Sequence, residues 1–313
     1  MRRVNRRKYE KFLFGGHLKL RDLKIEAFQK RVPHGYLYKE NIPRYPQPEF
    51  HVSHLKHDTN QDGLRGIRKD NGFKSPANDS LLWWSLVVGP DKITSAERRL
   101  LEATYPDRTE EQAQMQQSFL EKFSTSPVFQ KSSSLGSYRF TFPLEEVLQA
   151  FSDQVCFGAQ PVMRVFRTEL YKTEVMYTVL VHSPTVEELF SHLSLLTDNP
   201  DCVCSYKDGH FIWRSEAMCK EHRYKLVQKH DEKQIEAEEL SFPKYYVWDH
   251  VGVALHVDEH VLEFDADRLR ENLKFCHRAE PTIKGSSFEQ FEQAEEVVKE
   301  LWPDCPSPLE KAE

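Results

Sequence analysis

Apolar and polar positions along the chain predict short strands interspersed with helices. "SLLWWSLVV" (80–88) is a continuous apolar run, too short for a core helix, and predicts a buried strand. "SYRFTF" (137–142) alternates apolar and polar residues as a strand does. The stretch 94–129 predicts helix, with Ser95 as its cap and Pro106 separating two helices. Because strands and helices follow no regular alternation, we expect an α+β domain with a mixed, mostly antiparallel sheet.

The rest of the chain continues this irregular order. Pro143 is expected to open a helix, Asp208-Gly209 to turn a hairpin, and 215–240 to form a charged helix. The remaining expected elements are strands in 161–184, a helix over 185–196 capped by Thr185, a final strand pair from 244–257 and 260–265, and a helix over 265–275.

Charge divides the chain into three parts. Residues 1–48 are basic and then proline-rich, and residues 1–31 hold 11 Lys and Arg against three acids. We expect this part to be an N-terminal arm that contacts RNA or carries a nuclear signal, or else a solvated tail. Residues 49–276 are expected to form one domain with a helical insertion around 92–130, and 277–313 a C-terminal helix and charged tail.

Composition excludes several classes of protein. The net charge of −6 argues against attraction of nucleic acid by the chain as a whole. Because no apolar run reaches the roughly 18 residues of a membrane span, we expect a protein without membrane contact, in the cytoplasm, the nucleus or both. Phosphate-binding loops of the G-x-G-x-x-G and P-loop types are missing from the sequence.

Four residues with zinc-binding side chains occur close together in the sequence. They are Cys202, Cys204, Cys219 and His222. The usual paired C-x2-C knuckle is missing, and Cys202 and Cys204 would share one face of a strand, which packing also explains. We therefore expect no bound zinc.

The stretch "HLKHDTNQDGLRGIRKDNGF" (54–73) carries the strongest chemical pattern. It places His57 and Thr59 at the end of a strand, ahead of a short amphipathic helix that Asn60 or Asp62 can cap. Gly72 is expected to end that helix in the left-handed conformation. The pattern fits a ligand-binding corner, in which the imidazole and hydroxyl form hydrogen bonds to a sugar, or a structural strand–helix corner.

This H-x-T…L-x-x-I…G-F order resembles the opening motif of the ADP-ribosyltransferase superfamily, which includes poly-ADP-ribose polymerase catalytic domains. The resemblance implies an ADP-ribosyltransferase-like fold and NAD as substrate. It assigns His57, Thr59 and Gly72 to the ribose corner. The segment "GSYRFTF" is similar to the superfamily's strand whose tyrosine stacks on nicotinamide, which implies NAD contacts from Ser137 and Tyr138. Longer segments, such as "LLWWSLVVGP", resemble a many-membered group of bony-fish proteins.

The catalytic acid is the point where the sequence departs from the superfamily. The segment "KYYVWD" resembles the strand that begins with the catalytic glutamate, but it has Lys244 at that position. A carboxylate is wanted there to stabilise a cationic transition state. Glu174, at the start of an expected strand, is the best substitute, and Glu239 is the next.

Two functions follow as alternatives. The first is an NAD-dependent mono-ADP-ribosyltransferase that acts on protein or nucleic acid, with innate defence as its expected setting. Its catalytic residues would be His57, Tyr138 and Glu174. The second is a catalytically inactive interaction or RNA-binding module of the same fold. The related RNA 2′-phosphotransferases would need Arg65, Arg68 and Arg139 to converge around a phosphate.

Overall fold

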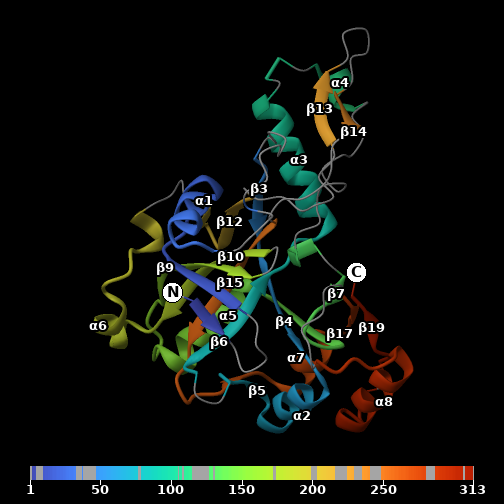
Figure 1. Ribbon diagram of the computed structural model, residues 1–313. Helices are drawn as coiled ribbons and strands as arrows, with labels where there is room; N and C mark the ends of the chain where they lie inside the picture. The colour runs from blue at the N-terminus through green and yellow to red at the C-terminus, as the bar shows by residue number, and fades with distance from the viewer. Residues whose placement is uncertain are drawn as a thin grey trace.

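The computed structural model describes most of the chain (Figure 1). The described residues are 2–4, 10–32, 37, 47–76, 79–104, 106–107, 109–114, 127–129, 131–171, 174–198, 203–215, 224–228, 235–239, 248–279, 286–305 and 307–312.

A ten-stranded sheet of described residues forms the centre of the fold, in the order β1-β2-β9-β10-β15-β6-β4-β8-β17-β19. Neighbouring strands are antiparallel, except for the parallel pairs β10–β15 and β17–β19. From one edge to the other, the strands are β1 (Arg2–Val4), β2 (Glu10–Gly15), β9 (Val162–Tyr171), β10 (Glu174–His182), β15 (Trp248–His256), β6 (Leu81–Leu86), β4 (His54–Thr59), β8 (Tyr138–Pro143), β17 (Leu273–Phe275) and β19 (Glu310–Lys311).

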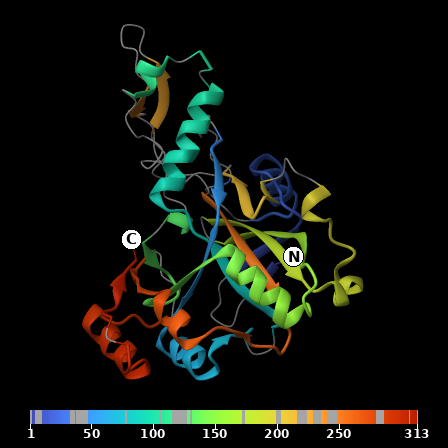
Figure 2. The same cartoon turned by 180° about the vertical axis from the view of Figure 1, so that it is seen from behind.

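The two faces of this sheet differ in chemistry because successive side chains of a strand point to opposite faces. One face, which we call the apolar face, carries buried residues such as Leu55, Trp84, Phe142, Val179 and Val253. Helix α5 (Leu144–Val155) packs its apolar side near β8, and Figure 2 shows it crossing in front of the sheet. Most of the hydrophobic core therefore lies on this face.

Smaller elements surround the central sheet. The helices are α1 (Leu20–Gln29), α2 (Gln61–Asp70), α3 (Pro90–Thr104), α4 (Glu110–Gln114), α6 (Glu187–Phe190), α7 (Ala266–Glu271) and α8 (Phe291–Leu301), with short 3-10 turns at Pro127–Phe129, Pro184–Val186 and Leu196–Asp198. The other sheets are a three-stranded sheet in the order β11 (Cys204–Lys207), β12 (His210–Arg214) and β3 (Glu49–Val52), and three strand pairs. The pairs are β13 (Tyr224–Gln228) with β14 (Ile235–Glu239), β5 (Gly72–Phe73) with β16 (Leu262–Glu263), and β7 (Ser132–Ser133) with β18 (His277–Arg278).

The α+β class and the mostly antiparallel sheet are confirmed. The apolar run 80–88 contains the central strand β6, and the hairpin between β11 and β12 turns at Asp208 and Gly209, both with positive φ. The central sheet also extends beyond the expected domain limits. Residues from the expected N-terminal arm form β2 and α1, and β2 pairs with β9.

Several expected elements are wrong in detail. The segment 215–240 contains a two-stranded hairpin of β13 and β14 where we expected a charged helix. The segment 260–265 contributes β16, which pairs with β5 and not with β15. Helix α3 begins at Pro90, so Ser95 lies inside it, and Ser183 rather than Thr185 caps the turn before α6. Pairing between strands, local for β13 with β14 and long-range for β16 with β5, decides these elements, whereas propensity describes only the preference of single residues.

Within the part of the chain that the structure describes, each helix is too short or too polar to cross a membrane. The same residues include no group of three or more His, Cys, Asp or Glu side chains placed to hold a metal ion. Cys204 is buried and its thiol donates to the Ser205 carbonyl, while Cys202, Cys219 and His222 lie outside the described residues.

Candidate functional site

The strand–helix corner forms as the sequence predicts, with one correction. β4 ends at Thr59, and the side chain of Asn60 caps α2 by accepting a hydrogen bond from the Gly63 amide at 3.0 Å. Asn71 takes the left-handed conformation at the end of α2 with φ of 47°, so the expectation for Gly72 is wrong. Gly72 instead allows close backbone contact, because a Cβ there would lie 2.4 Å from the Leu262 carbonyl oxygen.

His57 lies among aromatic side chains on the apolar face. Its ring centroid is 5.1 Å from that of Phe73 and 5.5 Å from that of Trp84. The Nδ1 atom donates a hydrogen bond of 2.9 Å to the Trp83 carbonyl. Burial lowers the pKa of His57, although the Trp83 carbonyl and the Asp58 carboxylate oppose that shift. Packing against these rings and the hydrogen bond to Trp83 are enough to explain a neutral histidine at this position without a ligand.

Thr59 and Tyr138 are direct cross-strand partners of β4 and β8, so they share the face of His57. Gly136, two residues before Tyr138, packs against the strand–helix corner, since a Cβ there would lie 2.2 Å from the Thr59 carbonyl oxygen. Tyr138 is completely buried, and its hydroxyl has no hydrogen-bond partner among the described residues. Burial raises the pKa of Tyr138, and the neighbouring Glu289 raises it further. Ser137 is also buried, and its hydroxyl accepts a hydrogen bond from the Glu289 amide at 2.9 Å.

Glu174 is not brought to this corner. Glu174 lies at the start of β10, where it pairs with Trp248. Val179, five residues further along β10, is the residue level with the corner: it pairs with Val253, which pairs with Trp84 next to His57. With strands about 4.8 Å apart and residues about 3.3 Å apart, Glu174 lies roughly 20 Å from His57. The odd spacing also points its side chain to the opposite face. The carboxylate beside Tyr138 is Glu289; Lys244 and the side chain of Glu239 lie outside the described residues.

The three arginines of the phosphotransferase alternative do not converge. Arg65 binds Glu300 through both terminal nitrogens, at 2.8 and 2.7 Å. Arg68 donates to the Leu301 carbonyl at 3.0 Å, on the same side of α2. Arg139 lies on the opposite face of the central sheet from Tyr138, because the two residues are adjacent in β8.

A second group of polar side chains covers that opposite face, which we call the charged face. It includes Lys11, Lys56, Asp58, Trp83, Arg139, Arg167, Glu169, Glu174, Thr178 and His250, from β2, β4, β6, β8, β9, β10 and β15. The strand registers bring them together: Lys56 pairs with Ser85, Ser85 with Gly252, and Gly252 with Thr178, which pairs with Arg167. The polar side chains therefore form a band that runs across the central strands of the sheet.

Buried ion pairs organise the charged face. Arg139 binds both oxygens of Asp58, at 2.7 and 2.8 Å, and is only 3% exposed. Burial would raise the pKa of Asp58, but the Arg139 guanidinium outweighs it and holds the pKa below its ordinary value. Lys11 and Arg167 both contact the buried carboxylate of Glu169. Glu174 also lies on this face, so the charged residues named on it leave an excess of one positive charge.

Buried polar atoms of the charged face that lack a hydrogen-bond partner among the described residues include the hydroxyl of Thr178 and the Nδ1 atom of His250. Burial, followed by the charges of Lys56 and Lys11, lowers the pKa of His250 to about 3. Lys56, Asp58 and His250 were not among the residues that we assigned to a site from the sequence, whereas Trp83 belongs to the segment "WWSL", a second candidate for the stacking role of Tyr138. The available signal was the alternation of "HLKHDT", which puts charges on one face and His57 on the other.

Lys56 predicts a specific pH dependence of stability. Burial and the Arg139 charge lower its pKa to about 7, against the opposing effects of Asp58 and Cys276. Between pH 7 and the ordinary pKa of 10.5, the unfolded chain binds a proton that the folded chain does not, so stability rises with pH in this window. We expect the unfolding free energy of the native protein to gain about 2 kcal/mol over Lys56→Met between pH 7.5 and 9.5.

Urea unfolding at a series of pH values measures this difference. Lys207→Met, which removes an exposed lysine, is the matched control and should follow the native protein. If the unfolding free energies of the native protein and of Lys56→Met change in parallel with pH, the pKa of Lys56 is not depressed.

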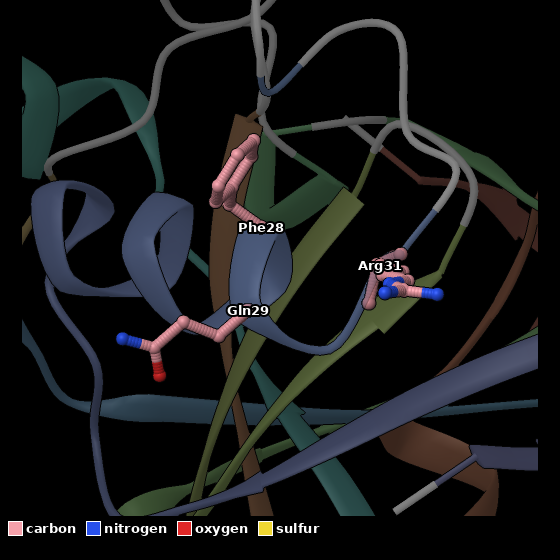
Figure 3. Close-up of a pocket in the computed structure, with 4 residues that line it drawn as sticks. Phe28, Gln29 and Arg31 are labelled. Atoms are coloured by element: carbon pink, nitrogen blue, oxygen red, sulfur yellow. The ribbon is translucent and has the colours of Figure 1, made fainter.

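A surface pocket elsewhere carries no comparable chemistry. It lies at the end of α1, lined by Phe28, Gln29, Arg31 and Val32. The three labelled side chains point in different directions (Figure 3), so they offer no common point of contact to a ligand.

Comparison with known proteins adds no family to this description. No protein-family model matches the chain, no curated protein matches it, and no solved structure is similar to it.

Proposed function

We propose that this protein is a non-catalytic binding module that holds a phosphate-bearing ligand on the charged face. The observation that carries the proposal is the excess of cations there: among the described residues of this face on β2, β4, β8, β9 and β10, the cations are Lys11, Lys56, Arg139 and Arg167, and the anions are Asp58, Glu169 and Glu174. Lys56 is 6% exposed and Arg139 is 3% exposed. Cations held in such buried positions attract anions more strongly than cations in water do.

Lys56 is the side chain whose charge a bound anion changes most. Its depressed pKa near 7 comes from burial and from the neighbouring Arg139 charge. An anion beside it favours the ammonium form and so raises this pKa. Binding at pH 8 is therefore coupled to uptake of a proton, a signature that a structural lysine remote from the ligand does not produce.

Calorimetric titration with inorganic pyrophosphate tests the proposal. We expect Lys56→Met to weaken binding about tenfold, since a charged hydrogen bond contributes about 1.5–3 kcal/mol. Lys207→Met should bind as the native protein does. Repeating the native titration at pH 8 in buffers of different ionisation enthalpy measures the proton uptake. Absence of pyrophosphate binding to the native protein would end the proposal.

An NAD-dependent mono-ADP-ribosyltransferase acting on protein or nucleic acid is the second candidate, with innate defence as its setting. The pairing of Thr59 with Tyr138 on the His57 face supports it. NAD titration should then show binding that His57→Ala removes. Transfer of label from NAD should be lost in Glu289→Gln and kept in Glu174→Gln, because Glu289 is the carboxylate beside Tyr138. No NAD binding by the native protein would remove this candidate.

RNA contact through the basic residues 1–31 stays a prediction. Binding that falls steeply with salt, and that is lost when basic residues of this segment are neutralised, supports it. Salt-independent binding contradicts it.

A further inference from the structure

We propose that residues 184–193, which we call the strap, form a cover over the carboxyl ends of β10 and β15 that opens when the medium is acidified. The strap contains the 3-10 turn Pro184–Val186 and helix α6, and it lies at the margin of the molecule (Figure 1). Opening exposes Phe190 together with His256, the last residue of β15. The contacts that hold the strap closed involve no ligand, so this device goes beyond the proposed function.

The strap is fixed to the central sheet at both of its ends. Ser183, directly after β10, is buried. At the other end, the Ser194 carbonyl accepts a hydrogen bond of 2.9 Å from the Val165 amide, and Leu195 forms a β-bridge with Arg164 of β9. The residues between these two anchors can therefore move away from the sheet without pulling a strand out of it.

Arg164 is the side chain that links the strap to the sheet. It is only 4% exposed, and its guanidinium donates to the Leu193 carbonyl and to the Glu187 carboxylate. Its Nε atom lies 3.0 Å from Nε2 of His182. Because Nε of arginine can only donate, Nε2 must accept, and the ring proton of His182 is on Nδ1, which donates to the Ser183 carbonyl at 2.8 Å. The closed strap therefore requires a neutral His182.

A second proton on His182 conflicts with the closed arrangement, because it would place a donor at Nε2 against the Arg164 Nε donor. The Glu187 carboxylate, 3.7 Å from Nε2, attracts the imidazolium and opposes this effect. Burial, together with the Arg164 charge, lowers the pKa of His182 below its ordinary value of 6.5, against the Ser183 carbonyl and Glu187.

The sign of the pH effect follows from this shift. When the strap opens, water solvates the imidazole of His182 and its pKa returns toward the ordinary value of 6.5. At a pH below that value the open form binds a proton that the closed form does not bind. The closed form therefore loses stability relative to the open form as the pH falls through this range.

The other ionisable groups around His182 do not reverse this direction. Phe190 lies between two histidines, with its ring centroid 4.9 Å from that of His182 and 5.0 Å from that of His256. Burial lowers the pKa of His256, against the charge of Asp258, so His256 also gains a proton when the strap opens. Cys156, at the end of α5, stays neutral because burial raises the pKa of its thiol.

Hydrogen exchange of the intact protein, followed by mass spectrometry, tests the proposal. We expect exchange of the strap amides, relative to their intrinsic rates, to become about tenfold faster between about pH 7 and about pH 5, because opening is linked to proton uptake by His182. Helix α5 should keep its protection over the same range. Strap exchange that does not depend on pH, or an equal loss of protection in α5, would overturn the proposal.

Variants identify the group that takes up the proton. His182→Gln retains an acceptor for Arg164 but cannot be protonated, so it should lose most of the pH dependence of strap exchange. His192→Gln is the matched control, because His192 is an exposed histidine of the strap, and it should follow the native protein. A native pH dependence in His182→Gln would overturn the role of His182.

A second variant tests the strap if His182→Gln does not fold. Glu187→Gln weakens the contact with Arg164 on the half-exposed side of the strap. Strap exchange at about pH 7.5 should then be about two- to fivefold faster than in the native protein, since such ion pairs stabilise only modestly. Unchanged exchange in Glu187→Gln would show that Arg164 does not hold the strap through this carboxylate.

Discussion

Asp58→Ala is expected to lower the unfolding free energy by about 3–5 kcal/mol, because it leaves a buried arginine without its carboxylate partner. The Asp58–Arg139 pair is bidentate, and the two side chains are only 11% and 4% exposed. Water cannot fully solvate the guanidinium once the carboxylate is removed. Urea unfolding at pH 7 measures the loss.

The structure offers a matched control with the same chemistry at the surface. Arg65 and Glu300 form an equally short bidentate pair, but Glu300 is 60% exposed. Glu300→Ala should have a much smaller effect, because water and salt screen exposed charges. The double variant Asp58→Ala/Arg139→Met should recover much of the lost stability, since it removes the uncompensated charge. Equal losses in Asp58→Ala and Glu300→Ala would contradict the importance of burial.

Gly136→Ala is expected to lower stability by about 3 kcal/mol, at the upper end of the range for overpacking. The added methyl group would lie 2.2 Å from the Thr59 carbonyl oxygen and 2.4 Å from the Asn60 amide nitrogen. Both atoms belong to the backbone, so relief requires β4 to separate from the segment before β8. Such a shift also displaces Asn60, which caps α2. Thermal unfolding and circular dichroism measure the loss.

Gly66→Ala is the control for this substitution. Gly66 lies inside α2, and no neighbouring atom lies within 4 Å of an added Cβ. Alanine forms helix better than glycine, so this variant should gain about 0.5–1 kcal/mol. If Gly136→Ala is as stable as the native protein, the contact between Gly136 and the strand–helix corner is not needed for folding.

Local sequence patterns predicted individual elements well. The cap at Asn60, the amphipathic spacing of Leu64 and Ile67 and the apolar run at 80–88 were sufficient for α2 and β6. The role of Gly72 was predicted wrongly because two different structural requirements both favour glycine. A left-handed helix end and a close backbone contact both favour glycine, and Asn71 supplied the first.

The site depended on information that one strand cannot contain. Alternation in "HLKHDT" shows that His57 and Asp58 face opposite ways, but not which face is covered by α5 and the aromatic side chains. Only the pairing of β4 with β8 shows that Arg139 meets Asp58, 81 residues away. Likewise, the strand order separates Glu174 from His57, and strand order is a property of the whole chain.

The position of β15 has a consequence for how the protein is made. This strand lies between β10 and β6, yet it begins at residue 248, and its neighbours end at residues 182 and 86. During synthesis both neighbours emerge well before the strand that joins them, and the unpaired backbone N–H and C=O groups along their edges stay open to other chains. Such long-range pairing is slow, so we expect nascent or truncated chains ending before β15 to aggregate or to engage chaperones. The two halves of the sheet become one only after β15 has been synthesised.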